Sequence, residues 1–585
     1  MGELLREDKK AFLTRNKFSV SLRLLNLLRE YLSKLLSHAQ RENVERRPIM
    51  ANKNLFSTKN INGKASKTGS PASRNVRVPK TDTINEAGGK AYSFPPKHGL
   101  AQYVSTGCLG NTYYAGGAEQ LEMILNISSK LSVEFLAKCA VYARQKAFMK
   151  DTPALLLAII AARAKTDKER DLFSSTFNQV VDNGKMLQNF VQIVRSGKTG
   201  RSSFGSRPKK LIQNWLTSVT DKQIINASIG NEPSLADIIK MVHPHAEDKK
   251  REALLGHIIG RNVSAKYLPE VLRDFEDFKK GETDVVPDIP WLMLTSQELS
   301  ENQWKAIAKN MKWHALRMNL ETLQRHGVFK DKKMVDYVAR QLTDEEQIRK
   351  ARVFPYQLLM AYTASVNVPD KLHKALEDAL EIATQNIPEF KGSVVVCPDH
   401  SGSMHSPVTG QRAGATTQVQ CVDVAALISA CVLRKNPEAR VLPFAESVNQ
   451  TIRLNPRDTV MSNANVLRRL PAGGTNCSAP LQLLNREGSS PDLIIFVSDC
   501  ESWKDFTPDR GTQGMREFAA IQKRNPKAKL VAIDLQPNSS TQFKESNSIL
   551  NIGGFSDHVF ELIADFSKGH FSGDHWVDMI EKTEI

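Results

Sequence analysis

Cysteine is scarce in this chain of 585 residues, which holds seven, and no Cys-x-x-Cys pair occurs among them. The seven are spread from Cys108 to Cys500, mostly between apolar neighbours. Their odd number and wide spacing argue against a disulfide framework and against a structural zinc site. They are typical of small buried hydrophobic side chains in a reducing compartment, so we expect a cytoplasmic protein.

Long apolar runs are also missing. The run 155–162 falls well short of the roughly 20 residues that a membrane-spanning helix needs. The first residues mix acidic and basic side chains and lack the apolar core of a signal peptide. We therefore expect no membrane partner.

Acidic residues are in deficit, since 63 Asp and Glu face 80 Lys and Arg and leave a net charge of +17. Residues 1–90 hold 19 basic and 8 acidic side chains, whereas residues 391–585 hold 20 basic and 21 acidic ones. A large positive surplus favours a polyanionic partner, either nucleic acid or an anionic membrane surface. Because the last third of the chain is neutral, we expect the preceding parts to bind that partner.

The first 84 residues divide into two segments. Residues 1–49 carry a leucine-rich amphipathic pattern, which predicts a packed helical extension or, alternatively, a basic helix for a partner or membrane surface. Met50 offers an alternative start of the chain. Residues 50–84 are rich in Lys, Asn, Ser and Gly, and they predict a flexible basic linker.

Residues 85–387 show apolar positions at spacings of three and four, broken at short intervals by Gly, Pro and Asp or Asn. That spacing predicts many short helices in series. Because no strand pattern occurs from about residue 97 to 385, we expect stacked helical hairpins of the solenoid type, although no strict repeat occurs. The clearest helical segments are 118–128, 133–148, 153–164, 168–180, 186–196, 235–241, 252–259 and 301–310.

From residue 388 to 585 short apolar runs alternate with helical stretches. Strands buried on both faces and joined through helices predict a doubly wound parallel α/β sheet. Ligands bind such a sheet at the carboxyl ends of its strands. The predicted strands are 393–399, 440–445, 492–499 and 528–535, and the predicted helices are 418–433, 479–484 and 514–523.

Oxygen-bearing side chains follow these predicted strands. Asp399, Ser401 and Ser403 come directly after the first strand, Thr475 lies in a Gly-Gly-Thr loop, and Asp499 ends the strand 492–499. Carboxylates and hydroxyls are hard ligands that suit Mg²⁺ first, with Mn²⁺ or Ca²⁺ as alternatives. In order and context, the five residues resemble the metal-ion-dependent adhesion site of von Willebrand factor A domains. The alternative is an A-type domain whose loop keeps its shape but binds no functional ligand.

The same loop offers little for catalysis. A serine hydrolase needs a positioned histidine and acid, and His400 and His405 lie in a loop without a Gly-x-Ser-x-Gly turn. We expect both histidines to be solvated. The sequence holds no P-loop, no His-Glu-x-x-His and no dinucleotide fingerprint, and no carboxylate cluster for two metals beyond Asp399 and Asp499. We therefore expect no enzyme activity.

Further motifs run along the chain from about residue 85 to 585. They are 88–94, 100–107, 110–114, 212–215, 237–243, 304–306, 316–320, 351–359, 471–480 and 497–502. In collinear order these motifs resemble the Ro autoantigen family, in which a TROVE module precedes an A domain. The chain looks like a bacterial or phage-type Ro homologue.

This resemblance implies a ring of HEAT-like helical repeats, closed by the A domain, with a positively charged central hole. Ro proteins bind small structured Y RNAs on their outer surface and take single-stranded ends of misfolded RNA into the hole. They serve in RNA quality control without cleaving RNA. The implied partners are Y-like and misfolded RNA and an exoribonuclease such as polynucleotide phosphorylase, with a monomeric protein in the ribonucleoprotein.

Residues 195–210 hold six cations and no acid, with Gly and Ser between them. Such a stretch suits a flexible loop that grips phosphates, and its one aromatic ring is available to stack on a base. The alternative is a solvated basic loop. The resemblance to the family implies two further RNA contacts, Lys240 and His243, in the motif 237–243 at the end of a later helix. The predicted RNA-binding residues are Arg195, Lys198, Arg201, Phe204, Arg207, Lys209, Lys210, Lys240 and His243.

The chain departs from the Ro pattern just before that later helix. Ro proteins carry a turn rich in Lys and Arg there, whereas residues 225–234 hold no cation. Lost cations weaken phosphate contacts, which puts Y-type RNA binding in question and leaves residues 50–80 and 195–210 to compensate.

Two functions remain open. The first is a Ro-type RNA-binding protein that acts in RNA quality control or as a ribonucleoprotein scaffold. The second is a metal-dependent protein-interaction scaffold, in which the A domain captures a carboxylate of a partner through its cation and RNA binding is incidental.

Overall fold

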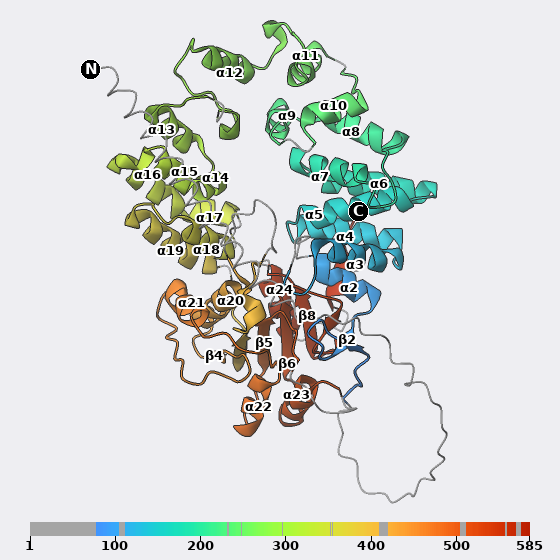
Figure 1. Ribbon diagram of the computed structural model, residues 1–585, viewed down its shortest axis with the longest axis vertical. Coiled ribbons are helices and arrows are strands. Elements are labelled where there is room, and N and C mark those ends of the chain that lie inside the picture. Colours follow the sequence, from blue (N-terminus) through green and yellow to red (C-terminus); the bar gives the residue numbers. More distant parts are fainter. Residues whose placement is uncertain are drawn as a thin grey trace, which may run out of the picture. The chain divides into compact units, whose positions relative to one another are not determined.

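The computed structural model describes residues 78–104, 112–230, 233–246, 248–294, 297–351, 353, 355–385, 387–408, 419–503, 511–555, 558–568 and 575–585 (Figure 1). The chain divides into two units, Met1–Asn75 and Val76–Ile585, and all of these residues belong to the second. The predicted N-terminal extension and most of the predicted linker lie outside the described residues.

The predicted helical region consists of helices and the connections between them, apart from its first strands. Helices of this region follow one another in Figure 1 from α2 to α19. Their bounds are α2 Pro96–Val104, α3 Gly117–Ser129, α4 Val133–Gln145, α5 Asp151–Arg163, α6 Asp167–Val180, α7 Gly184–Arg195, α8 Ser206–Ser218, α9 Asp221–Ala227, α10 Leu235–Val242, α11 Lys249–Ile258, η2 Ala265–Tyr267, α12 Glu270–Lys280, η3 Trp291–Met293, α13 Glu301–Asn310, α14 Trp313–Met318, α15 Leu320–Arg325, η4 Val328–Lys330, α16 Lys332–Leu342, α17 Glu345–Ala351, α18 Pro355–Ala364 and α19 Asp370–Thr384.

Local sequence explains where these helices begin. The Thr166 hydroxyl accepts from the Glu169 amide at the start of α6, and the Glu169 carboxylate caps the Thr166 amide in return. Ser132 and Asn183 cap α4 and α7 in the same way through one side-chain acceptor each. Successive helices pack on one another, as α4 does on α5 and α6, and α18 on α19. The predicted stacked helical hairpins are thus confirmed.

Both ends of this helical series pack on the α/β domain. Helices α2 and α4 contact α25 (His575–Glu581), and α2 also contacts β8 (Ile549–Gly553). At the other end, α18 and α19 contact α20 (Cys421–Lys435) and α21 (Val460–Arg468). The second unit is therefore a closed ring of helical repeats and one α/β domain.

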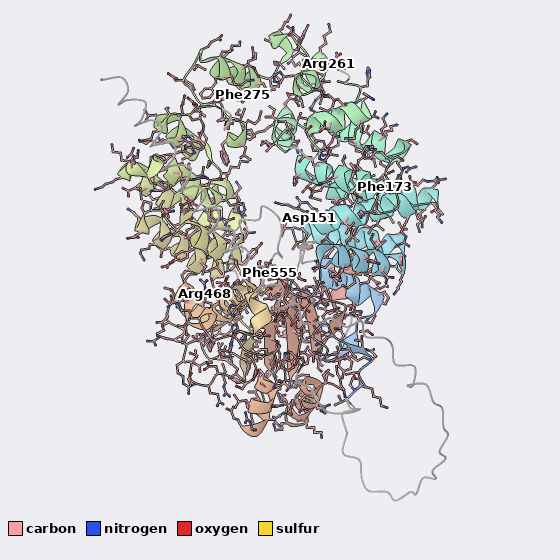
Figure 2. All side chains as sticks on the ribbon, viewed as in Figure 1. Asp151, Phe173, Arg261, Phe275, Arg468 and Phe555 are labelled. Atoms are coloured by element: carbon pink, nitrogen blue, oxygen red, sulfur yellow. The ribbon has the colours of Figure 1, made fainter. Side chains whose placement is uncertain are left out.

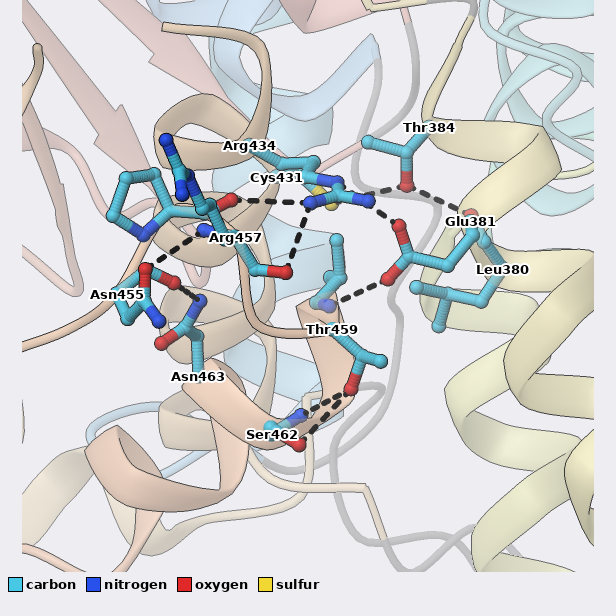
Figure 3. A network of polar contacts seen from close by, with 12 residues as sticks. Leu380, Glu381, Thr384, Cys431, Arg434, Asn455, Arg457, Thr459, Ser462 and Asn463 are labelled. Carbon is cyan, nitrogen blue, oxygen red and sulfur yellow. Dashed lines mark hydrogen bonds and ion pairs between the residues drawn. The ribbon is translucent and has the colours of Figure 1, made fainter. Parts of the chain in front are cut away.

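Figure 3 shows the polar contacts at the second of these junctions. The Glu381 carboxylate of α19 lies 3.2 Å from Nε of Arg434 on α20 and accepts from the Val460 amide over 2.6 Å. Arg434 in turn donates to the Arg457 carbonyl over 3.3 Å. One carboxylate thereby ties the last repeat helix to two elements of the α/β domain.

The α/β domain contains a five-stranded parallel sheet in the order β4-β3-β5-β6-β8. Strands β3, β5 and β6 coincide closely with three of the predicted strands, because each is an apolar run buried on both faces. The pairing of Pro398 with Val497 brings the carboxyl ends of β3 and β5 side by side. The remaining bounds are β3 Val394–Pro398, η5 Gly402–His405, β4 Arg440–Val441, α22 Ala479–Arg486, β5 Leu493–Ser498, α23 Gln513–Arg524, β6 Lys529–Asp534 and α24 His558–Ser567.

A second, small sheet was not predicted. Strands β1 (Thr83–Ile84) and β2 (Lys90–Ser93) form an antiparallel pair, and β2 pairs with β7 (Ser540–Thr541) of the α/β domain. The end of the predicted linker is therefore a strand at residues 83 and 84. This sheet holds the start of the helical series against the α/β domain.

Two expectations about the chain as a whole can be compared with the structure. Cysteines at the described positions are free and buried, as predicted. None of the helices that the structure describes combines the length and the apolar character needed to cross a bilayer.

Candidate metal centre and nucleic-acid surface

The predicted metal ligands lie at the carboxyl edge of the parallel sheet. Asp399 follows β3 and Asp499 follows β5, and the Asp399 amide donates to the Val497 carbonyl over 3.0 Å. Ser401 directly precedes the 3₁₀ turn η5, and Ser403 lies within it. All four residues and Thr475 are at most 5% exposed.

Hydrogen bonds fix the loop that carries these ligands. The Ser401 amide donates to Oδ1 of Asp399 over 2.8 Å, and the Ser498 hydroxyl donates to its Oδ2 over 2.6 Å. The hydroxyl oxygens of Ser401 and Ser403 lie 3.4 Å apart. The Gly402 amide donates to the Gly473 carbonyl over 2.9 Å, which holds the loop that carries Thr475 against the first loop.

The electrostatics of the two carboxylates favour a cation. Burial, and then the charge of Asp499, raise the pKa of Asp399 to about 7. Burial also raises the pKa of Asp499, although a hydrogen bond from Ser403 opposes the shift. Oδ2 of Asp499 is buried and has no hydrogen-bond partner among the described residues. Two repelling carboxylates, an orphaned oxygen and neighbouring hydroxyls together fit a hard divalent cation.

Residues outside the predicted set also surround this centre. Glu501 and Asp534 are buried, and burial raises the pKa of Glu501 to about 7 and that of Asp534 well above its usual range. Glu501 accepts from Asn538 over 2.8 Å and from the Ala87 amide over 3.3 Å. Glu501 lies within the motif 497–502, but the sequence does not reveal its contacts, because its partners lie far away along the chain.

A tyrosine of the helical region also reaches the centre. Burial first, and then the charge of Asp499, raise the pKa of the phenol of Tyr114, which lies just before α3, and hydrogen bonding to Ser403 opposes the shift. The helical region therefore contributes directly to the surroundings of the metal ligands.

The structure also brings the basic stretch and the later helix together. Lys209 and Lys210 lie on the first turns of α8, and Lys240 and His243 lie at the end of α10. The Gln213 amide of α8 donates to the His243 carbonyl over 3.2 Å. Lys210, Lys240 and His243 are exposed and Lys209 is half-buried. Because α8 and α10 pack on one another, we call these four residues the α8–α10 surface.

Comparison with known proteins decides the family. Residues 160–393 match the family model of the TROVE domain, and residues 393–567 match that of the Ro60 vWA domain. The chain belongs to the Ro family. The RNA-binding protein RO60 of Deinococcus radiodurans is 24% identical over 84% of this chain and 96% of its own length. That of Caenorhabditis elegans is 24% identical over 41% of this chain and 38% of its own length.

The fold agrees with this assignment. The crystal structure of the Deinococcus radiodurans RO (RSR) protein matches 82% of this Ro-family chain and 100% of its own chain. The TM-score is 0.59 at 22% sequence identity. The predicted fold class, a helical-repeat ring with an A domain, is confirmed.

Three of the predicted RNA-binding residues in this Ro chain make contacts within the protein. Phe204 is only 9% exposed and packs in the core, so its ring is not available for stacking. Arg201 donates to the carbonyls of Ala161, Ser203 and Phe204. Arg207 lies 2.6 Å from Asp171 in an ion pair. The interpretation of Phe204 as a stacking residue is corrected.

The other cations of the stretch are more accessible. Arg195 is exposed, although one guanidinium nitrogen donates to the Ser202 carbonyl over 3.2 Å, and Lys198 is exposed. Both lie near the start of the loop that leads to α8. Arg195 and Lys198 therefore stay predicted RNA contacts.

The loop histidines near the metal ligands differ from expectation. His400 is 6% exposed and its Nδ1 lies 2.8 Å from the Pro471 carbonyl, so it is buried and not solvated. His405 is half-buried. The described residues contain no group of three His, Cys, Asp or Glu side chains arranged to hold a metal ion. A cation between Asp399 and Asp499 would therefore depend on the serine and threonine hydroxyls for further ligands.

Proposed function

We propose that this Ro-family chain binds RNA through the α8–α10 surface. The observation that carries the proposal is the convergence of Lys209, Lys210, Lys240 and His243 within a TROVE domain whose relatives are named RNA-binding proteins. Clustered, accessible cations of this kind bind phosphates and make affinity depend on salt.

A charge-reversal pair tests this proposal. Lys209→Glu with Lys210→Glu is compared with Lys332→Glu with Lys333→Glu, an adjacent pair of exposed lysines at the start of α16. Binding of a hairpin RNA with a single-stranded end is titrated at several salt concentrations. We expect the first pair to weaken binding at least tenfold and to reduce the salt slope by about 1 per lysine. If both charge-reversal pairs weaken RNA binding equally, the proposal is wrong.

The RNA ligands are proposed from the family. We propose small structured Y-like RNA and the single-stranded ends of misfolded RNA, in quality control or as a ribonucleoprotein scaffold in the cytoplasm. The protein acts as a monomer, and an exoribonuclease such as polynucleotide phosphorylase supplies cleavage. Because residues 225–234 hold no cation, Y-like RNA is expected to bind less tightly than the single-stranded ends.

Binding without catalysis is part of the same proposal. Purified protein incubated with end-labelled RNA and Mg²⁺ is expected to leave the RNA intact. Fragments that appear with the protein, and not with its Asp399→Ala variant, would show a metal-dependent nuclease instead.

We further propose that Asp399, Ser401, Ser403, Thr475 and Asp499 hold a divalent cation, with Mg²⁺ first. When bound, the ion neutralises two buried carboxylates and offers an open position to a further oxygen ligand. The support is the orphaned Asp499 Oδ2 and the all-oxygen donor set. Isothermal titration with Mg²⁺ and Mn²⁺ tests the site, and Asp399→Asn should abolish binding.

A further inference from the structure

A mainly apolar cavity lies between α9, α12 and α13 in the helical series. Its volume is about 510 Å³, within the range of cavities that hold small organic ligands. Its walls come from α9, the segment 286–294 with the 3₁₀ turn η3, the end of α13 and the start of α14. Val271 of α12 completes the wall, one turn before Phe275, which Figure 2 labels.

The lining of this cavity changes from apolar at its floor to polar at its mouth. The buried lining residues are all apolar, namely Ile225, Pro287, Leu294 and Ile307. The exposed lining residues are all polar, namely Asp221, Lys222, Asn226, Asp288, Asn310 and Lys312. Water at the floor would find few hydrogen-bond partners, so an apolar group gains free energy by taking its place.

The half-buried part of the lining suits a flat aromatic ring. Trp291 supplies an indole, Met311 a thioether and Pro290 a rigid ring face. Aromatic groups pack well on such surfaces, and a thioether sulfur makes favourable contacts with ring edges. The Trp291 ring centre lies 6.1 Å from that of Trp304, whose ring stacks on His326 at a centre-to-centre distance of 4.0 Å. The indole is therefore held in place before any ligand arrives.

Charge pairs at the mouth leave it close to neutral. Nζ of Lys222 lies 3.3 Å from Oδ2 of Asp288, which joins α9 to the segment 286–294. Asp221 lies 3.3 Å from a guanidinium nitrogen of Arg251 on α11. The exposed lining holds two aspartates and two lysines, so an anion gains little there. Its two asparagine amides, in contrast, offer hydrogen bonds to an uncharged group.

We propose that this cavity binds an uncharged small molecule with a flat aromatic ring and one hydrogen-bonding group. The ring packs against Trp291 and Met311, and the polar group reaches Asn226 or Asn310 at the mouth. The residues that line the cavity do not belong to the α8–α10 surface, so the inference does not rest on the proposed RNA binding.

Two dyes that differ by a sulfonate group test the charge of the ligand. Phenylnaphthylamine is uncharged, anilinonaphthalenesulfonate adds an anionic group to the same rings, and both fluoresce more strongly in apolar surroundings. Fluorescence titration of the full chain should show one saturable site for phenylnaphthylamine. Because the cavity would have to bury the sulfonate charge, the anionic dye should bind about tenfold more weakly. Equal or tighter binding of the anionic dye would overturn the proposal.

Two substitutions test whether the dye occupies this cavity. Ala315→Phe fills the cavity from α14, whereas Ala306→Phe makes the same change at a half-buried alanine of α13 that does not line it. Ala315→Phe should weaken binding of phenylnaphthylamine about tenfold, and Ala306→Phe should bind it as the parent does. The dye should raise the melting temperature of the parent and of Ala306→Phe, but not that of Ala315→Phe.

Trp291→Ala keeps the test valid if Ala315→Phe does not fold. It removes the indole surface without adding bulk, so phenylnaphthylamine should again bind about tenfold more weakly. If the parent binds no dye, or if both cavity variants bind it as tightly as the parent, the site is wrong.

Competition with RNA separates a small-molecule site from a nucleic-acid surface. A single-stranded oligoribonucleotide at a concentration that saturates its own binding should leave phenylnaphthylamine bound. Displacement of the dye would make the cavity part of an RNA site and overturn the proposal. The dye titration does not depend on Lys209 and Lys210, so failure of the proposed RNA surface and failure of the cavity site are distinguished.

Discussion

The side-chain amide of Gln213 donates to the backbone carbonyl of His243 over 3.2 Å, and to that of Val242 over 2.6 Å. His243 ends α10 in a left-handed conformation, with φ of 49°, which leaves its carbonyl free for this contact. One glutamine thereby joins α8, which carries Lys209 and Lys210, to the end of α10.

Replacing Gln213 by Ala should weaken RNA binding without changing its salt dependence. The variant removes no charge, so the slope of log affinity against log salt should stay constant while affinity falls a few-fold. Loss of the two hydrogen bonds should also cost about 1 kcal/mol of unfolding free energy. Asn214→Ala, an exposed neighbour on α8, is the control for both measurements. A changed salt slope would show that Gln213 does not act through geometry.

The sequence was informative about this surface only in part. Lys209, Lys210 and His243 were identified by charge and by resemblance, and the structure brings them together. Phe204 was misjudged because a Gly- and Ser-rich surrounding is typical of an exposed loop. Its ring packs in the core, and Arg201 beside it binds the Ala161 carbonyl, a contact 40 residues away that no local pattern reveals.

The same reasoning explains which strands were predicted. Strand β5 is an unbroken apolar run, buried along its whole length, so its pattern is visible without tertiary information. Strand β8 was missed because buried Asn551 interrupts its apolar run. Asn551 is satisfied by Thr541 and the Phe543 carbonyl, which only the folded chain places beside it. Four of the predicted metal ligands, in contrast, lie in loops directly after predictable strands, whereas Thr475 lies in the loop between α21 and α22.

Asp399→Asn should separate metal binding from folding. The substitution removes one of two buried, repelling carboxylates, so the metal-free variant should be at least as stable as the parent. Stabilisation by Mg²⁺, about 2.7 kcal/mol at a hundredfold excess over the dissociation constant, should disappear. Thermal unfolding with Mg²⁺ and with EDTA measures both effects. Asp458→Asn, which changes an exposed acid of the same domain, should keep the full stabilisation.

The buried carboxylates also predict how stability depends on pH in EDTA. The folded-state pKa of Asp399, about 7, exceeds the value near 4 of an unfolded aspartate, so the folded protein binds the extra proton between these values. Stability should therefore fall as pH rises from 4 to 7 and level off above it, by up to about 1.4 kcal/mol per pH unit for one group. The difference in unfolding free energy between parent and Asp399→Asn isolates this contribution. A difference that does not vary with pH would contradict it.

Gly89→Ala tests the contact between the first strands and the metal centre. A Cβ at Gly89 would lie 2.0 Å from the Ser502 carbonyl oxygen, which also accepts from the Asn85 side chain over 2.8 Å. Because backbone must move to make room, we expect a loss of about 1–3 kcal/mol in urea unfolding. Ser502 follows Asp499 by three residues, so Mg²⁺ affinity should fall as well.

The matched control for that substitution is Gly99→Ala. Gly99 lies within α2, and a Cβ there would meet only the Ile127 and Phe94 side chains at 3.4 and 3.6 Å. Alanine also favours the helical state by up to about 1 kcal/mol, so this variant should be as stable as the parent or more so. If Gly89→Ala loses stability but keeps its Mg²⁺ affinity, the first strands support only the fold. If Mg²⁺ affinity falls in Gly89→Ala and not in Gly99→Ala, the contact at Ser502 also positions the loop that holds Asp499.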